Sequence, residues 1–243
     1  MVYHDKGSLG QNFIKYSGLV RELVEASSIN SSDLVLEIGA GKGIITRELR
    51  RAAKEVIAIE KDPELAEKTG AVLADFLEYD LPTEKYKVFS NIPFSITAEI
   101  MDKFWRAENQ PTELYLIMQK ETAEKFIAGG QSAVLFKPWY EVEILGEIDR
   151  TNFTLKPQIK IVFVKFTKRE KPFILEEDKE EFKKFVVYNF NYFLKSFTYP
   201  QRKRVEGMYK IGGKKPSEVS TDTWLLLFKT WKRLSIQVGN GEL

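Results

Sequence analysis

A tetrapeptide, Asn91-Ile92-Pro93-Phe94, follows a short apolar segment and brings together an amide, a rigid turn and an aromatic ring. The side-chain oxygen of Asn91 and the backbone carbonyl of Ile92 can each accept one N–H of an exocyclic amine such as that of adenine. These hydrogen bonds would localise the nitrogen lone pair, otherwise delocalised into the ring, and direct it at an electrophilic methyl group. Pro93 fixes the backbone, and the Phe94 ring can stack on a base removed from its helix and face a methyl-sulfonium cation. The tetrapeptide predicts the catalytic residues of methyl transfer to adenine without a general base; the alternative is a polar turn after a strand.

Glycines and carboxylates after three other segments are suited to the cofactor that this reaction needs. The apolar run 34–38 leads into Gly39-Ala40-Gly41-Lys42-Gly43, where Gly39 and Gly41 allow a tight turn and a close approach of a ligand. Glu60 can accept hydrogen bonds from ribose hydroxyls, and Asp75 can accept one from an adenine amino group. The spacing G-x-G-x-G differs from the dinucleotide pattern, and no second phosphate site follows, which favours an adenosine that carries an amino acid. The alternatives are a glycine turn that serves only packing and carboxylates on a solvated surface.

The elements that must position these residues alternate between two periodicities. A parallel sheet wrapped by helices, the Rossmann-like α/β class, is the fold predicted by this alternation. In such sheets ligands bind at the carboxyl ends of the strands, where all the residues above lie. The expected strands are 34–38, 56–59, 71–73, 86–90 and 114–118, and the expected helices are 44–53, a short one from Pro63, 96–105 and 121–127. Two further strand-like runs, 140–148 and 159–166, lack a helix between them and predict an antiparallel pair at the sheet edge.

A charged break at 168–172 separates this pattern from two helical stretches, 176–192 and 221–234. We therefore expect a catalytic domain over residues 1–172 and a small helical domain over residues 173–243. The aromatic residues of the second part are expected to form its core, and a base-stacking platform is the alternative for those between residues 188 and 193. These aromatic residues are Tyr188, Phe190, Tyr192, Phe193, Trp224 and Trp231.

Composition excludes several classes of chemistry. The 243 residues include no cysteine and one histidine, His4, which excludes thiol nucleophiles, disulfides and Cys/His metal sites and leaves a His-based triad without support. We expect no metal. No apolar run is long enough to cross a bilayer and the N-terminus lacks a signal-peptide pattern, so a cytoplasmic protein without a membrane partner is expected.

Positive charge is concentrated near the end of the chain, although the formal net charge is only +2. From Leu194 onward the chain has ten basic and four acidic residues, so the formal charge of this part is +6. Aromatic residues interleave with the basic ones, which suits phosphate contacts and stacking on RNA; a solvated helix surface is the alternative. The predicted RNA-binding residues are Lys195, Arg202, Lys203, Arg204, Lys210, Lys214 and Lys215.

Together these segments resemble the ribosomal RNA adenine N6-dimethyltransferases, and within them the Erm methyltransferases. The resemblance covers nearly the whole chain: 9–14 is similar to the opening motif, 37–43 to the cofactor loop and 91–97 (NIPFSIT) to the catalytic motif. Further similarity lies at Gln119-Lys120-Glu121, at Asn152-Phe153 with Pro157, and at 199–204. The resemblance implies S-adenosylmethionine as cofactor. It also implies cofactor contacts from Gln11, Asn12, Ile14, Gly39, Gly41, Glu60, Lys61, Asp75, Phe76 and Asn91.

The Erm branch implies a monomer that methylates one adenine of 23S rRNA in the peptidyl-transferase loop, once or twice, before the ribosome is fully assembled. Such methylation would confer resistance to macrolides, lincosamides and streptogramin B. Ile92, where the small-subunit branch usually has leucine, and the segment 185–204 favour this branch. Two alternatives stay open: a 16S rRNA dimethyltransferase of ribosome biogenesis, and a non-catalytic RNA-binding descendant. Two features depart from the family: only 14 residues separate Glu60 from Asp75, and Leu155 stands where a proline is common.

Overall fold

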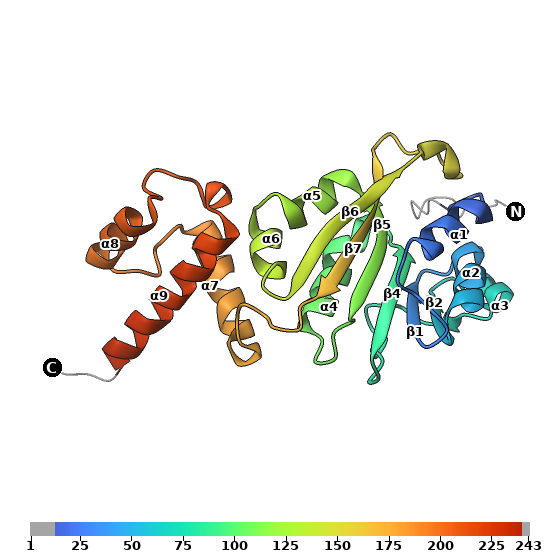
Figure 1. Ribbon diagram of the computed structural model, residues 1–243, viewed down its shortest axis with the longest axis horizontal. Coiled ribbons are helices and arrows are strands. Elements are labelled where there is room, and N and C mark those ends of the chain that lie inside the picture. Colours follow the sequence, from blue (N-terminus) through green and yellow to red (C-terminus); the bar gives the residue numbers. More distant parts are fainter. Residues whose placement is uncertain (1–12, 240–243) are drawn as a thin grey trace, which may run out of the picture. The chain divides into compact units, whose positions relative to one another are not determined.

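In the computed structural model, which describes residues 13–239, seven strands of the described chain form one sheet (Figure 1). The order is β3-β2-β1-β4-β5-β7-β6. The strands are β1 (Leu34–Ile38), β2 (Glu55–Glu60), β3 (Val72–Leu73), β4 (Tyr86–Asn91), β5 (Glu113–Gln119), β6 (Tyr140–Ile148) and β7 (Ile161–Lys168). The pairs from β3 to β5 are parallel, whereas β7 runs antiparallel to β5. The predicted Rossmann-like α/β fold with an antiparallel edge is confirmed.

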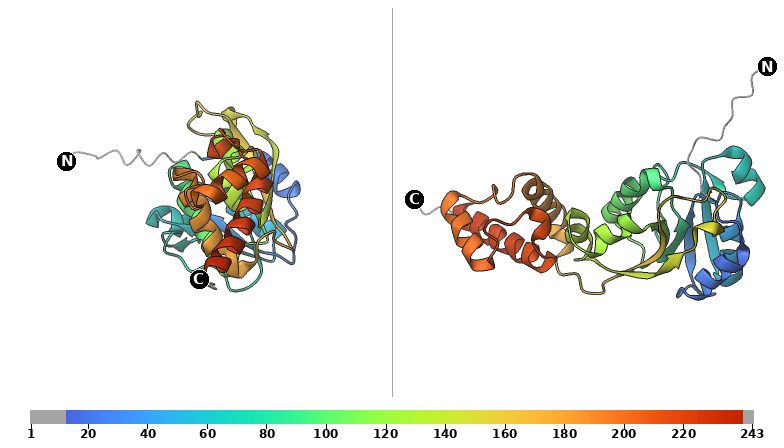
Figure 2. Two further views of the ribbon diagram at one scale, coloured as in Figure 1. Left: turned by 90° about the vertical axis from the view of Figure 1, so that its left-hand side faces the viewer. Right: turned by 90° about the horizontal axis from the view of Figure 1, so that it is seen from above.

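Helices cover both faces of this sheet (Figure 2). On one face, α1 (Ser17–Glu25) and α2 (Ile44–Ala52) pack on each other and close an apolar cluster with strand residues such as Phe89 and Phe163. On the other face, α4 (Thr97–Arg106) buries Ile100, Met101, Phe104 and Trp105. The short α3 (Pro63–Thr69) is capped by Asp62, whose carboxylate accepts hydrogen bonds from the backbone N–H groups of Glu64 and Leu65 at 2.9 and 3.1 Å. The sequence pattern did not predict α1.

The chain divides into two compact units. One comprises the residues up to Ala123 together with Glu143–Lys168, and the other comprises Glu124–Val142 and the chain from Arg169 onward. The second unit contains α6 (Gln131–Phe136), α7 (Lys179–Asn191), α8 (Tyr199–Tyr209), α9 (Thr221–Gly239) and the second half of α5 (Lys120–Ile127). The expected single boundary after residue 172 lies four residues beyond the observed one before Arg169, and residues 124–142 were expected in the first domain. They group with the C-terminal helices because α6 packs on α7 and α9.

Aromatic rings form the core of the C-terminal unit, as expected for Trp224, which is fully buried, and for Phe190, which stacks on it at 4.8 Å between ring centroids. The expectation is wrong for Tyr188 and Tyr192, whose exposed fractions are 44% and 53%. The reason is helical periodicity: the residues of α7 that point inward are Phe182, Phe185, Val186 and Asn189. Tyr188 and Tyr192 therefore lie outside this buried face.

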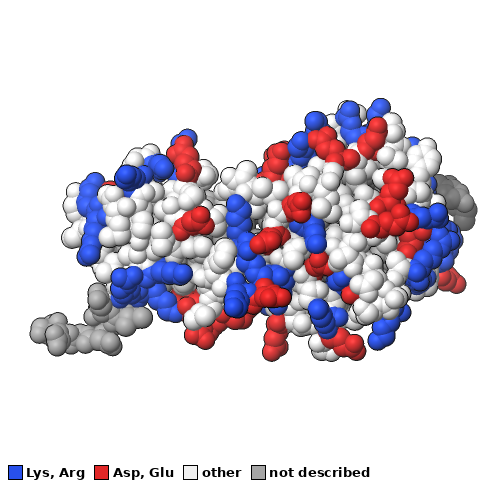
Figure 3. Space-filling view, viewed as in Figure 1, with Lys and Arg blue, Asp and Glu red and all other residues white. Residues whose placement is uncertain are grey.

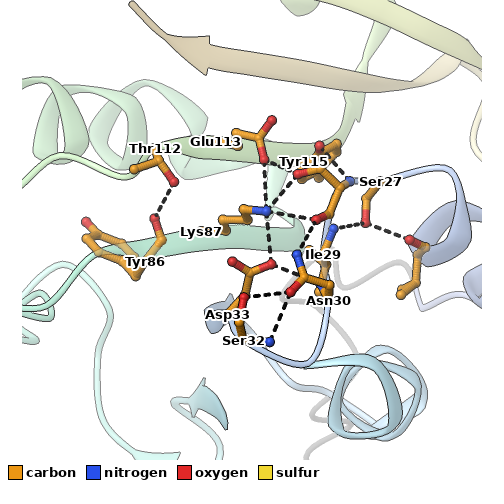
Figure 4. Close-up of polar contacts among 12 residues, drawn as sticks. Ser27, Ile29, Asn30, Ser32, Asp33, Tyr86, Lys87, Thr112, Glu113 and Tyr115 are labelled. Atoms are coloured by element: carbon orange, nitrogen blue, oxygen red, sulfur yellow. Dashed lines mark hydrogen bonds and ion pairs between the residues drawn. The ribbon is translucent and has the colours of Figure 1, made fainter. Parts of the chain in front are cut away.

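An ionic network connects the amino-terminal ends of three strands (Figure 4). The predicted site lies at the other, carboxyl ends of the strands. Lys87 Nζ lies 2.9 Å from Asp33 Oδ2 and 3.2 Å from Glu113 Oε2, and Lys165 Nζ lies 2.8 Å from Glu113 Oε1. Ser28 donates its hydroxyl to Glu113 and its backbone N–H to the hydroxyl of Tyr115, the latter at 2.9 Å. Burial raises the pKa of Glu113, but the hydrogen bonds from Lys165, Ser28 and Lys87 outweigh burial and lower the pKa to about 2.

This network predicts a loss of stability in acid. The pKa of Glu113 is lower in the folded chain than its ordinary value of 4.5, so its ionised form stabilises the fold above about pH 4.5. That stabilisation is lost as the pH falls towards about 2. We expect Glu113→Gln to lower the free energy of unfolding at neutral pH by about 2 kcal/mol and to flatten its decline in acid, measured by urea unfolding across this pH range. Parallel pH profiles of the two proteins would contradict this role.

Candidate cofactor and base-binding site

The glycine turn after β1 is held by the end of the neighbouring strand β2. Gly39 and Ala40 donate their N–H groups to the carbonyl of Ile59 at 2.8 and 3.0 Å. Gly41 donates its N–H to Glu60 Oε2 at 2.8 Å. Gly39, Gly41 and Gly43 have φ values of 72, 53 and 72°, a region that favours glycine. The turn thus requires its glycines for backbone conformation, as the sequence predicts.

Only the first of the three glycines faces open space. A Cβ built on Gly41 would lie 2.6 Å from Phe13 Cε1, and one on Gly43 would lie 2.9 Å from Thr69 Cγ2. A Cβ built on Gly39 would meet nothing within 4 Å. Close packing with the protein explains Gly41 and Gly43, whereas the space beside Gly39 leaves room for a ligand to approach the backbone.

Glu60 is buried, with an exposed fraction of 4%, so the alternative of a solvated surface carboxylate is wrong for this residue. Its Oε1 accepts from the backbone N–H groups of Lys61 and Asp62 at 2.8 and 2.9 Å, while Oε2 accepts from Gly41. Three of about four acceptor positions of the carboxylate are thereby used, which leaves one for a ligand hydroxyl. Glu60 also joins the glycine turn to β2.

Asp75 lies past β3, whose Leu73 pairs with Glu60, and its carboxylate is half-buried. Lys61 Nζ lies 2.6 Å from Asp75 Oδ2, and Leu77 donates its N–H to Oδ1 at 3.0 Å. The hydrogen bond from Lys61 is the main cause that lowers the pKa of Asp75. A ligand amino group at Asp75 would therefore share this carboxylate with Lys61. The next residue, Phe76, is buried against Phe104, with ring centroids 5.4 Å apart.

The tetrapeptide that the sequence predicts to be catalytic lies at the carboxyl end of β4, beside β1 in the sheet. Ser90 fixes the two strand ends together by donating its hydroxyl to the carbonyl of Ile38 at 2.6 Å. Asn91 is the last residue of β4, Ile92 is buried, and Pro93 precedes a 3-10 turn, Phe94–Ile96, that leads into α4. Phe94 is half-buried and packs against the apolar cluster.

The last residue of the opening motif, Ile14, and the residue after it pair with a loop that is distant in the sequence. Ile14 forms a β-bridge with Phe153, and Lys15 donates its N–H to the carbonyl of Asn152 at 2.8 Å. The Ile14 side chain is buried in the apolar cluster, so its backbone is the part available to a ligand. Two of the predicted cofactor residues, Gln11 and Asn12, lie outside the described residues.

Sequence reasoning assigned no role to Glu37, which lies on β1 two residues before Gly39. Its exposed fraction is 1%, and among the described residues neither of its carboxyl oxygens has a hydrogen-bond partner. Burial raises the pKa of Glu37 to about 8. A charged residue in the apolar run LVLEI was the available signal, because an acid in a buried strand requires a partner. Thr46 and Arg50 of α2 act on the same carboxyl and lower its pKa, but burial outweighs them.

The predicted RNA-binding residues lie in the C-terminal unit and differ in their partners. Arg202 and Lys203 both pair with Glu206, at 2.9 and 3.3 Å, so their charge is partly neutralised. Arg204 is exposed and forms no ion pair among the described residues. The remaining predicted residues are likewise exposed: Lys195, Lys210, Lys214 and Lys215.

Two further observations concern residues 13–239, the part of the chain that the structure describes. No group of three or more acidic, histidine or cysteine residues in this part of the chain is arranged to hold a metal ion. No helix of the same part is long and apolar enough to span a membrane.

The chain is similar to enzymes that modify ribosomal RNA. Residues 3–198 match the family described as Ribosomal RNA adenine dimethylase. Ribosomal RNA small subunit methyltransferase A of Thermotoga neapolitana is 30% identical over 250 residues, covering 94% of this chain and 92% of that protein. The rRNA adenine N-6-methyltransferase of Limosilactobacillus reuteri is 31% identical over 189 residues, 73% of this chain and 77% of that protein. The crystal structure of 23S rRNA methyltransferase ErmE superposes with a TM-score of 0.73 and 26% identity, covering 90% and 99% of the two chains.

Proposed function

The chain belongs to the ribosomal RNA adenine dimethylase family, and from this premise we propose that it methylates the N6 amine of one adenine in 23S rRNA. It is an rRNA adenine methyltransferase that depends on S-adenosylmethionine. The observation that carries the proposal is the position of Asn91-Ile92-Pro93-Phe94 at the end of β4, directly beside the glycine turn after β1. This neighbourhood supports a target base and a cofactor that share one edge of the sheet.

The described residues fit S-adenosylmethionine, which supplies an electrophilic methyl group when bound. The open space at Gly39 accommodates a ligand against the backbone, and the unsatisfied acid Glu37 lies two residues away. Glu60 has an acceptor position left for a ribose hydroxyl, and Asp75 can accept from the adenine amino group in competition with Lys61. Glu60 and Asp75 lie at the carboxyl ends of the adjacent strands β2 and β3, a placement that suits one extended ligand across these strand ends.

The target base would be held by the tetrapeptide. The Asn91 side-chain oxygen and the Ile92 carbonyl each accept one N–H of the adenine amine and thereby direct its lone pair at the methyl group. Burial of Ile92 and the hydrogen bond from the Thr97 hydroxyl to the Pro93 carbonyl, at 3.2 Å, hold this backbone in place. The amine becomes acidic once it is alkylated and can lose its proton to water, so the reaction requires no histidine or cysteine.

Similarity to ErmE over 90% of this chain and the isoleucine at position 92 support the 23S target. On this proposal the enzyme acts as a cytoplasmic monomer on rRNA before ribosome assembly is complete. Its product would confer resistance to macrolides, lincosamides and streptogramin B. The second candidate is methylation of 16S rRNA, which is favoured by a small-subunit relative that covers 94% of this chain.

Transfer of labelled methyl from S-adenosylmethionine to protein-free 23S and 16S rRNA, with the modified base mapped by primer extension, tests the proposal. A stop at one adenine in the peptidyl-transferase loop is the expected result. A stop only in 16S rRNA would favour the second candidate, and absence of transfer to either RNA would favour a non-catalytic RNA-binding protein.

We expect Phe94→Ala to reduce transfer more than cofactor affinity. Loss of the ring removes stacking on the target base, an interaction that contributes about 1–3 kcal/mol per base. We therefore expect kcat/KM for rRNA to fall by about fivefold or more and the Kd of the cofactor, measured by calorimetry, to change little. Phe94→Tyr keeps the ring and serves as the control. An equal loss of cofactor affinity and transfer would place Phe94 in the cofactor site instead.

We expect Arg204→Glu to weaken RNA binding more than a reversal at an exposed lysine outside the basic cluster. Arg204 carries an exposed charge without an ion-pair partner among the described residues, whereas Arg202 and Lys203 share Glu206. The slope of log affinity against log salt should fall by about one if this residue contacts one phosphate. Lys171→Glu, an exposed lysine of the same unit, is the matched control. Equal effects of the two variants would mean that only net charge matters.

A further inference from the structure

We propose that Tyr188, Tyr192 and Lys195 form a stacking platform in the C-terminal unit that binds unpaired bases of the rRNA substrate. The inference rests on the proposed rRNA function but is independent of which rRNA carries the target adenine. The platform assigns RNA-base binding to Tyr188 and Tyr192, two residues that the sequence pattern predicts to lie in the core of the unit.

The two tyrosines present a paired aromatic surface. Their ring centroids are 5.3 Å apart at an interplanar angle of 46°, and both side chains are exposed. Lys195 Nζ lies 5.5 Å from the centroid of the Tyr192 ring. A base stacked on these rings would bring its phosphate within reach of this ammonium group, whose contact with the Tyr192 ring is a weak cation–π interaction.

A buried turn holds the platform in shape. Leu194 adopts a φ of 58° although it is not glycine, and its side chain is fully buried. This conformation costs about 1–2 kcal/mol, which burial of the side chain offsets. The buried Asn189 accepts the Ser196 hydroxyl at 3.0 Å and donates to the Phe185 carbonyl at 2.8 Å. Tyr192 and Lys195 are therefore directed outward by a fixed turn, so that little conformational freedom is lost when RNA binds.

The charge around the platform suits a polyanion. Residues 182–205 contain six basic residues and no acidic one. Basic side chains gather around α8 on the visible face of this unit (Figure 3). Tyr199, the most exposed large aromatic among the described residues at 73%, has Lys203 Nζ 5.9 Å from its ring centroid. This second aromatic and cationic pair follows the first along the chain and continues the same chemistry.

Unpaired bases are the occupant that this chemistry favours. Paired bases in a helix do not offer their faces to side chains, whereas single strands and loops do. The pair Phe173 and Arg169 shows the contrast within the same unit. Arg169 lies 4.5 Å from the Phe173 ring centroid, but its charge is shared with Glu141 at 2.7 Å. Because Glu141 neutralises Arg169, the pair of Phe173 and Arg169 has no excess positive charge to attract a phosphate.

The test measures RNA affinity without any methyl transfer. Fluorescence anisotropy would compare a labelled oligouridylate of about 12 nucleotides with a fully paired hairpin. The variants are the double substitution Tyr188→Ser with Tyr192→Ser, the conservative double substitution of both residues by phenylalanine, and Phe173→Ser as the matched control. We expect the serine pair to lower oligouridylate affinity by about fivefold or more, while hairpin affinity and the other two variants stay close to wild type.

Unchanged oligouridylate affinity in the serine pair would overturn the platform. Equal losses for oligouridylate and hairpin would also overturn it, because a duplex offers no base faces. Circular dichroism of each variant separates these outcomes from misfolding, and the phenylalanine pair, which keeps both rings, should retain affinity even if the serine pair is unstable. Failure of the proposed function is distinguishable: wild type would then transfer no methyl to rRNA, whatever the oligouridylate result.

Discussion

Asn91→Ala is expected to abolish methyl transfer while the protein stays folded. The substitution removes the acceptor that directs the lone pair of the target amine, and loss of one such preorganised group costs about 100-fold or more in kcat. Asn91 is half-buried at the end of β4, and its backbone pairing with β5 does not depend on the side chain. Transfer of labelled methyl to rRNA under saturating cofactor, together with the unfolding free energy from urea titration, measures both effects.

Asn30→Ala is the matched control for this variant. Asn30 is also an asparagine, is exposed, and lies in the turn before β1, at the sheet edge opposite to Asn91. We expect wild-type transfer from it and a small loss of stability, because its side chain accepts from the Ser32 N–H at 3.0 Å. Wild-type turnover by the Asn91 variant would remove this residue from the catalytic machinery and weaken the assignment of the tetrapeptide.

Gly39→Ala is expected to lower cofactor affinity by about tenfold or more, since a methyl group would occupy the space left for the ligand. Gly39 has a φ of 72°, so alanine also costs about 1 kcal/mol of backbone strain in the folded chain. A Cβ at this position meets no protein atom within 4 Å, so the fold itself accommodates the methyl group. Calorimetric titration with S-adenosylmethionine measures the affinity.

Gly213→Ala separates strain from occupancy of the site. Gly213 has a φ of 77° and equally open surroundings, but it belongs to the C-terminal unit. We expect both variants to lose similar stability and only the Gly39 variant to lose cofactor affinity. Normal affinity in the Gly39 variant would mean that the space beside this glycine is not used by the cofactor.

The local sequence pattern was sufficient to predict those strands and helices whose own residues show a clear periodicity. The alternation of strands and helices predicted the parallel sheet, and the break at 168–172 preceded the last helices. Three helices were missed. For α1, the four-residue spacing of Val20 and Val24 was an available signal. The signal was weaker for α6, which spans six residues, and for α8, which buries Val205 alone among its described residues. The signal for α8 was its capping residues, Thr198 and Gln201, rather than an apolar face.

The fold class, the glycine turn and the tetrapeptide at the end of β4 could be predicted from the amino-acid sequence. Each of these depends on backbone conformation or on residue types within a few positions. Which side chains are buried, and which partners they have, became clear from the three-dimensional structure. Glu37 is unsatisfied, Glu60 is tied to Gly41, and Tyr188 points away from the core. Burial and partner choice depend on segments that are distant in the chain, and no local pattern of residues specifies them.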